Sequence, residues 1–158
     1  MASDVMVKTF LAGRGYFGSH LADLSDEQLT TVPEGAHNNI MWNVGHILMS
    51  NYGMLHGASS VDVPAPAEWG PLFKGGSSPS DWGDDAPSAS EIMDAFNAQS
   101  DVIIADLKAD KFGDFKPMDL GGGLQLNSVD EALGFVVIHE GVHHGNVISL
   151  RNLLGVGK

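Results

Sequence analysis

Apolar residues recur at helical spacing in four stretches of this chain, and turn-forming residues separate the stretches. Such spacing places the apolar side chains of each stretch on one face, as in amphipathic α-helices. No stretch carries a convincing strand pattern. The sequence therefore predicts an all-α protein, a four-helix bundle in which each helix buries its apolar face against the others.

Helix-start signals support two of these boundaries. Ser88 is followed three residues later by Glu91, and Ser128 is followed in the same way by Glu131, so both pairs match a capping box. Asn38 is a suitable N-cap for the second helix, and Gly57 can end it. The four helices are expected near residues 3–24, 38–57, 88–108 and 128–154.

Between the second and third helices lies a long connection, residues 59–88, that holds five of the seven prolines. Proline excludes a long regular element there, so the segment is expected to be an ordered crossover loop. Trp69 and Trp82 lie within it, and large aromatic side chains usually pack a loop onto the body of the protein. They could also form a wall beside a substrate.

Length and composition exclude several classes of protein. With 158 residues the chain is the size of one domain, residues 1–158, and no apolar run is long enough for a membrane span. The N-terminus lacks the apolar stretch of a secretory signal, so a cytoplasmic location is expected. A net charge of -12 with only 8 Lys and Arg disfavours nucleic acid as a partner. Because the chain has no cysteine, any metal ligands must be His, Asp or Glu.

The fourth helix carries the strongest chemical signal, His139 and His143. Residues four apart on a helix share a face, so these two imidazoles can converge on one cation. They fall on the same stripe as Val136 and Val147, the stripe that should face the core. A buried imidazole pair needs a polar partner, and a metal ion would supply one.

Residues 139–143 also match the H-E-x-x-H pattern of zinc peptidases, in which Glu140 would activate the metal-bound water. Glu140 is therefore the candidate catalytic residue, although a supporting or surface role remains open. No carboxylate follows the motif, so the third ligand must come from upstream. His46 is the best candidate, because it lies in the middle of the apolar second helix. Three histidines leave coordination positions open for water or substrate, as in catalytic sites.

Together these motifs resemble a known family. The run Trp42-x-x-x-His46, followed by His139-x-x-x-His143-x-Gly145 with Asn146, is similar to the DinB and YfiT-like superfamily of metal-dependent enzymes. The resemblance implies a four-helix bundle, often dimeric, in which the three matched histidines bind nickel, zinc or another divalent ion. It also implies activities such as transfer or isomerisation with a small thiol as co-substrate.

Three functional hypotheses follow. The first is an enzyme, a metal-dependent hydrolase or thiol-dependent transferase that acts on a small molecule. The second is a non-catalytic protein that binds metal or a small ligand in a stress response, and the third is an H-E-x-x-H peptidase. The remaining histidines have no comparable partners and are expected at the surface or in helix caps: His20, His37, His56 and His144.

Overall fold

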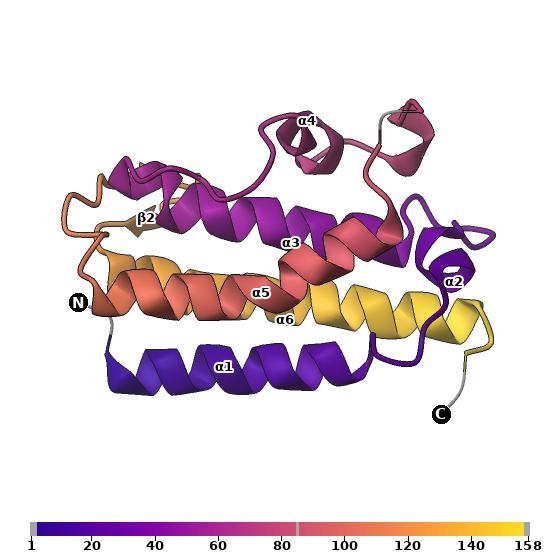
Figure 1. Cartoon of the computed structure of the whole chain (residues 1–158), viewed down its shortest axis with the longest axis horizontal. Helices are drawn as coiled ribbons and strands as arrows, with labels where there is room; N and C mark the ends of the chain where they lie inside the picture. Colours follow the sequence, from indigo (N-terminus) through magenta and orange to yellow (C-terminus); the bar gives the residue numbers. More distant parts are fainter. Residues whose placement is uncertain (1–2, 85, 157–158) are drawn as a thin grey trace.

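The computed structural model of the chain describes residues 3–84 and 86–156, which form a bundle of four long helices (Figure 1). α6 contacts both α1 and α3, while α5 lies mainly against α3. The predicted all-α architecture is confirmed. Within the described residues, no helix is both long and apolar enough to cross a membrane. The long helices are α1 (Asp4–Ser19), α3 (Ile40–Leu55), α5 (Ala89–Lys108) and α6 (Val129–Leu153).

The crossover between α3 and α5 packs onto the bundle, as the two tryptophans predicted. Trp69 is buried, and the Trp82 ring meets the buried Phe73 ring edge to face, 5.3 Å between centroids. The segment contains only short helical turns, because its prolines interrupt anything longer. These turns are a 3-10 helix (Gly57–Ser59), α4 (Trp69–Phe73) and a second 3-10 helix (Pro79–Asp81).

Side-chain caps start α5 and α6 where the sequence predicted. The Ser88 hydroxyl accepts the Glu91 N–H, and the Glu91 carboxylate accepts the Ser88 N–H, which completes a capping box. Ser128 accepts the Glu131 N–H in the same way. The Glu131 carboxylate, however, accepts the N–H of Asn127 instead of that of Ser128. In each helix, a side chain therefore satisfies one of the first N–H groups, which have no partner within the helix.

The first helix is shorter than predicted. α1 ends at Ser19, because the chain tightens there and the backbone N–H of His20 bonds to the Phe17 carbonyl. Leu21 still reaches the core, with 2% of its surface exposed. Its apolar spacing continues the helical pattern even though the helix has ended, which explains the predicted limit near residue 24.

Two further boundaries differ from the predictions. The N-cap of α3 is Asn39, whose side chain accepts the Trp42 N–H, and not Asn38. A short helix that is not among the four predicted ones begins after Ser25. The Ser25 hydroxyl caps this helix, α2 (Asp26–Thr30), in a capping box with Gln28.

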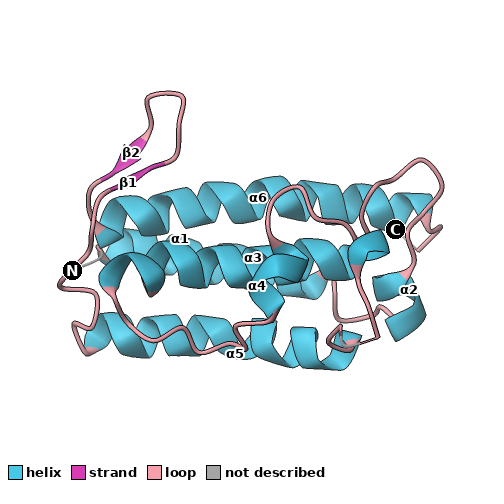
Figure 2. Cartoon of the chain, turned by 90° about the horizontal axis from the view of Figure 1, so that it is seen from above, coloured by secondary structure: helices cyan, strands magenta, loops and turns pink. Residues whose placement is uncertain are grey.

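A small antiparallel hairpin between α5 and α6 was not predicted. It joins β1 (Met118–Asp119) to β2 (Gln125–Leu126), with Met118 opposite Leu126, and it extends beyond the bundle (Figure 2). Two residues per strand are too few to give a recognisable alternation. The turn uses a run of three glycines, all with positive φ: Gly121, Gly122 and Gly123.

Candidate metal centre

The predicted stripe on α6 faces the interior of the bundle. Val136 and Val147 are fully buried, His143 is 9% exposed, and His139 is half-buried toward one edge of the bundle. Because α6 lies against α3 along this stripe, both imidazoles point toward α3.

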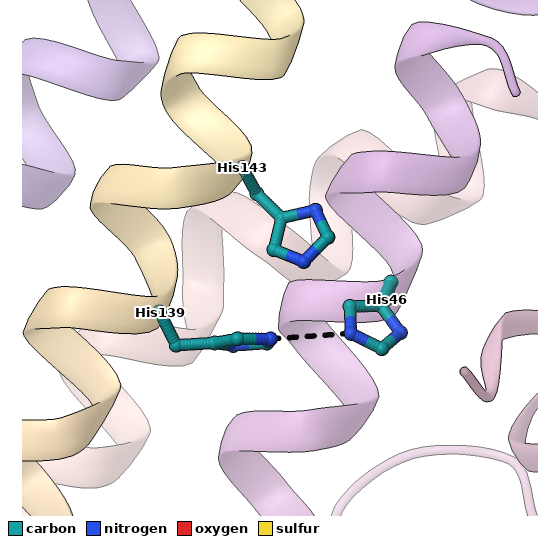
Figure 3. A group of neighbouring side chains, drawn as sticks. All are labelled: His46, His139 and His143. Carbon is teal, nitrogen blue, oxygen red and sulfur yellow. Dashed lines mark hydrogen bonds between the residues drawn. The ribbon is translucent and has the colours of Figure 1, made fainter.

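α3 supplies the third imidazole, His46, from the opposite side (Figure 3). Its Nε2 atom lies 3.2 Å from Nε2 of His139. The ring centroid of His143 lies 4.6 Å from that of His46 and 4.7 Å from that of His139. One ring nitrogen from each residue lies within 4.8 Å of the others. The structure thus brings together all three residues that the sequence proposed as ligands.

Hydrogen bonds fix how two of the rings are oriented. Nδ1 of His46 lies 2.7 Å from the backbone carbonyl oxygen of Phe73, and Nδ1 of His143 lies 2.8 Å from Oδ1 of Asn43. Both oxygens accept, so both Nδ1 atoms donate and the proton is absent from Nε2 in the neutral rings. The Asn43 amide cannot rotate freely, because its Nδ2 donates to the Asn39 carbonyl. The lone pairs of His46 and His143 therefore lie on Nε2.

Aromatic stacking holds the His46 and His139 rings in place. The Trp42 ring stacks on His46 at 4.9 Å with an interplanar angle of 10°, and Phe135 stacks on His139 at 6.1 Å and 14°. Gly45 allows the close approach of Phe73, since a Cβ atom there would clash with the Phe73 ring. The carbonyl that accepts from His46 therefore depends on a residue without a side chain.

The electrostatic setting keeps the α6 histidines neutral. Burial, reinforced by the neighbouring His46, lowers the pKa of His139 and of His143 to about 4. Near pH 7 both rings therefore present a lone pair and not a positive charge. Neutral imidazole is the form that binds metal ions.

One pair of these donors has the spacing that a bound cation requires. Two imidazole nitrogens face each other at 3.2 Å, and a tetrahedral ion with metal–nitrogen distances of about 2.0–2.1 Å needs about 3.3–3.4 Å between ligands. In addition, Nδ1 of His139 is buried without a hydrogen-bond partner among the described residues, so this ring makes its polar contact through Nε2, the atom that faces His46.

An open cavity of about 710 Å³ adjoins the cluster. His46 and His139 form one side of it, and the Ser50 hydroxyl lies 3.4 Å from Nε2 of His46. The other walls are mostly apolar. They are formed by Met54, Met118, Leu120 and Phe135, with Gly53 and Gly75 between them.

Glu140 lies on a different side of α6. Its carboxylate, 4% exposed, accepts hydrogen bonds from the Arg14 guanidinium and, at 2.6 Å, from the Asn51 amide. Arg14 also donates to Gln99 and to the carbonyl of Phe96. The small cavity that Glu140 does line, about 200 Å³ between α1 and α6, contains none of the three clustered histidines.

The other four histidines differ in their surroundings. His37 is exposed, and His20 caps the end of α1, as expected. His56 follows α3 as its C-cap but is fully buried, with Nε2 2.9 Å from Asp106. The expectation for His144 is wrong, because that ring is 9% exposed, stacks on Phe17 and lies 3.1 Å from His20.

The sequence analysis did not identify the groups that orient the His46 and His143 rings. Asn43 is one of the few polar residues in the apolar run that opens α3, and a buried amide in such a run signals a specific partner. The Phe73 carbonyl gives no signal in the sequence, because every residue has one.

Comparison with known proteins agrees with the geometry. No curated protein is significantly similar to this chain. The sequence profile of the DinB superfamily, in contrast, matches residues 9–147, which include all three clustered histidines. The chain belongs to the DinB superfamily.

Proposed function

We propose that this protein is a metal-dependent enzyme that binds one divalent transition-metal ion through His46, His139 and His143. The observation that carries the proposal is the convergence of three ring nitrogens within 4.8 Å beside an open cavity. Imidazole ligands suit nickel and zinc among the late transition metals. A bound ion would polarise an oxygen or stabilise a thiolate, which is the chemistry of a hydrolase or a small-thiol transferase.

The chain's own groups would prepare the site for that chemistry. The carbonyl of Phe73 and the amide of Asn43 hold two Nε2 atoms toward the ion position. Three protein ligands leave room for a fourth ligand on the side of the cavity. The Ser50 hydroxyl, near His46, is placed to bond to such a ligand.

The peptidase hypothesis has less support. A general base in an H-E-x-x-H site must reach the metal-bound water, but the Glu140 carboxylate is engaged by Arg14 and Asn51. We therefore assign Glu140 a structural role. Peptide cleavage that disappears in a Glu140→Gln variant would restore the peptidase hypothesis.

Metal analysis of purified protein tests the proposal directly. We expect about one nickel or zinc ion per wild-type chain, and loss of most of it in His143→Ala. His144→Gln is the matched control, since it removes the next imidazole on the same helix and should leave metal content unchanged. Equal metal content in wild type and His143→Ala would refute the assignment.

An activity screen then separates an enzyme from a protein that only binds. Ester, amide and thiol-transfer substrates should be tested with metal-loaded protein and with a chelated sample. Turnover that chelation abolishes and metal restores supports the enzyme. Bound metal without turnover of any substrate would support the non-catalytic alternative.

A further inference from the structure

The cavity beside the histidine cluster carries no charged side chain among the residues that line it. Apart from the imidazoles, the Ser50 hydroxyl is the one side-chain polar group in the lining. A charge on a ligand body that packs against these walls would therefore lose part of its hydration without gaining a charged partner from the lining residues, which is costly.

The hairpin between α5 and α6 builds one wall of this cavity. Met118 and Leu120 are two residues apart, so they project from the same side of the strand, and both line the cavity. Asp119, between them, projects away and accepts the Gly121 N–H at 2.8 Å. The alternation thus turns the apolar side chains of the hairpin toward the cavity and its carboxylate toward the turn.

Leu120 has little other role in the fold. It is 37% exposed and does not belong to either buried core cluster. Leu124, across the turn, is 43% exposed and does not line the cavity. The two leucines therefore form a matched pair, one that lines the cavity and one that does not.

From these observations we infer that the substrate has a single anionic, metal-binding head and an uncharged apolar body that packs on Met118 and Leu120. The inference rests on the proposed function, because the head needs the ion. Three neutral imidazoles leave the full charge of a divalent ion to attract an anion. The walls of Met54, Met118, Leu120 and Phe135 then favour a body without charge.

Three aromatic thiols with the same ring and head test the inference: 4-methylbenzenethiol, 4-mercaptobenzenesulfonate and 4-(aminomethyl)benzenethiol. Each is titrated anaerobically into Co²⁺-loaded full-length protein, at equal thiolate concentrations, while the cobalt absorption spectrum is followed. We expect the methyl compound to bind about tenfold more tightly than either charged compound. The cationic thiol is the control for the net charge of -12, which by itself would make that compound bind best.

The hairpin variants locate the effect. Leu120→Ser should weaken binding of the methyl compound about threefold or more, whereas Leu124→Ser should leave it unchanged. Equal binding of the three thiols, tightest binding of the cationic one, or equal effects of the two serine variants would overturn the inference.

Equilibrium dialysis of Co²⁺ keeps the two proposals apart. If wild type and both serine variants retain cobalt equally but the expected order of thiols fails, only the assignment of the substrate is wrong. If wild type retains no cobalt, the metal centre itself is wrong and the inference falls with it.

Discussion

Two buried polar clusters lie on different sides of α6, and they are completed in different ways. In the first, the Glu140 carboxylate and the Arg14 guanidinium bond to each other and to the side chains of Gln99 and Asn51. In the second, Nε2 of His46 and Nε2 of His139 are directed at each other, and Nδ1 of His139 has no partner among the described residues. A cluster whose opposite charges pair with each other serves the fold, whereas one whose imidazole nitrogens converge is suited to a ligand.

The largest effect on stability should come from breaking the cluster of Glu140 and Arg14. Glu140→Ala leaves the buried Arg14 charge without its partner, so we expect the free energy of unfolding to fall by about 3–5 kcal/mol. Urea denaturation of metal-free protein measures it. The metal content per folded chain should stay unchanged, because no ligand is removed.

Asp94→Ala is the control for that variant. Asp94 is an exposed acid on α5, and its loss should change the free energy of unfolding by no more than about 0.5 kcal/mol. If Glu140→Ala destabilised the protein as little as this control, the Arg14 network would not have the structural role assigned to it.

The second prediction concerns Asn43, which orients the His143 ring. Asn43→Ala should weaken zinc binding about 10–100-fold, because the His143 ring loses the acceptor that fixes its tautomer. Asn43→Asp keeps an oxygen acceptor and should retain most of the affinity. Competition with a chromophoric chelator gives the dissociation constants.

Asn51 offers the matched comparison on the same helix. It is also a buried asparagine of α3, but its amide serves Glu140 and not a ligand. Asn51→Ala should therefore lower the unfolding free energy while leaving zinc affinity within about twofold of wild type. Similar losses of zinc affinity in the two alanine variants would show that the two clusters are not independent.

The smallest effect is the pH dependence of a structural histidine. Burial lowers the pKa of His56 below its ordinary value, despite the opposing Asp106. The folded state thus keeps His56 neutral where the unfolded chain is protonated. Its contribution to stability is full above about pH 6.5 and is lost as the pH falls through the lowered folded-state pKa.

His56→Gln keeps an N–H donor for Asp106 but does not titrate in this range. The drop in unfolding free energy of metal-free protein between pH 7.5 and pH 5 should therefore be smaller in the variant, by on the order of 1 kcal/mol. Equal drops would mean that another group carries the pH dependence.

Local signals explain what the sequence could predict about the fold. The caps at Ser88 and Ser128 act within one helical turn, so they are visible in the sequence and both are confirmed. The end of α1 was placed too late, because burial of Leu21 in the core does not require a helix. The hairpin depends on two residue pairs and its contacts with the bundle, which no local pattern records.

The site was predictable only in part, for a similar reason. Spacing along α6 places His139 and His143 on one face, and an apolar helix around His46 marks it as a partner. Which ring nitrogen each histidine presents depends on groups distant in the sequence, such as the Phe73 carbonyl. No local pattern marks Arg14 as the partner of Glu140, because the two residues are 126 positions apart in the sequence.

The hydrogen bond from His46 to the Phe73 carbonyl joins a ligand to the crossover segment, residues 59–88. If that ring holds an ion, linkage is reciprocal: whatever orders the segment tightens the ion, and the ion orders the segment to the same extent. Shortening or cleaving the crossover would then change the metal affinity, although every metal-binding histidine is retained. The free energy of metal binding would in this way depend on the connection between α3 and α5.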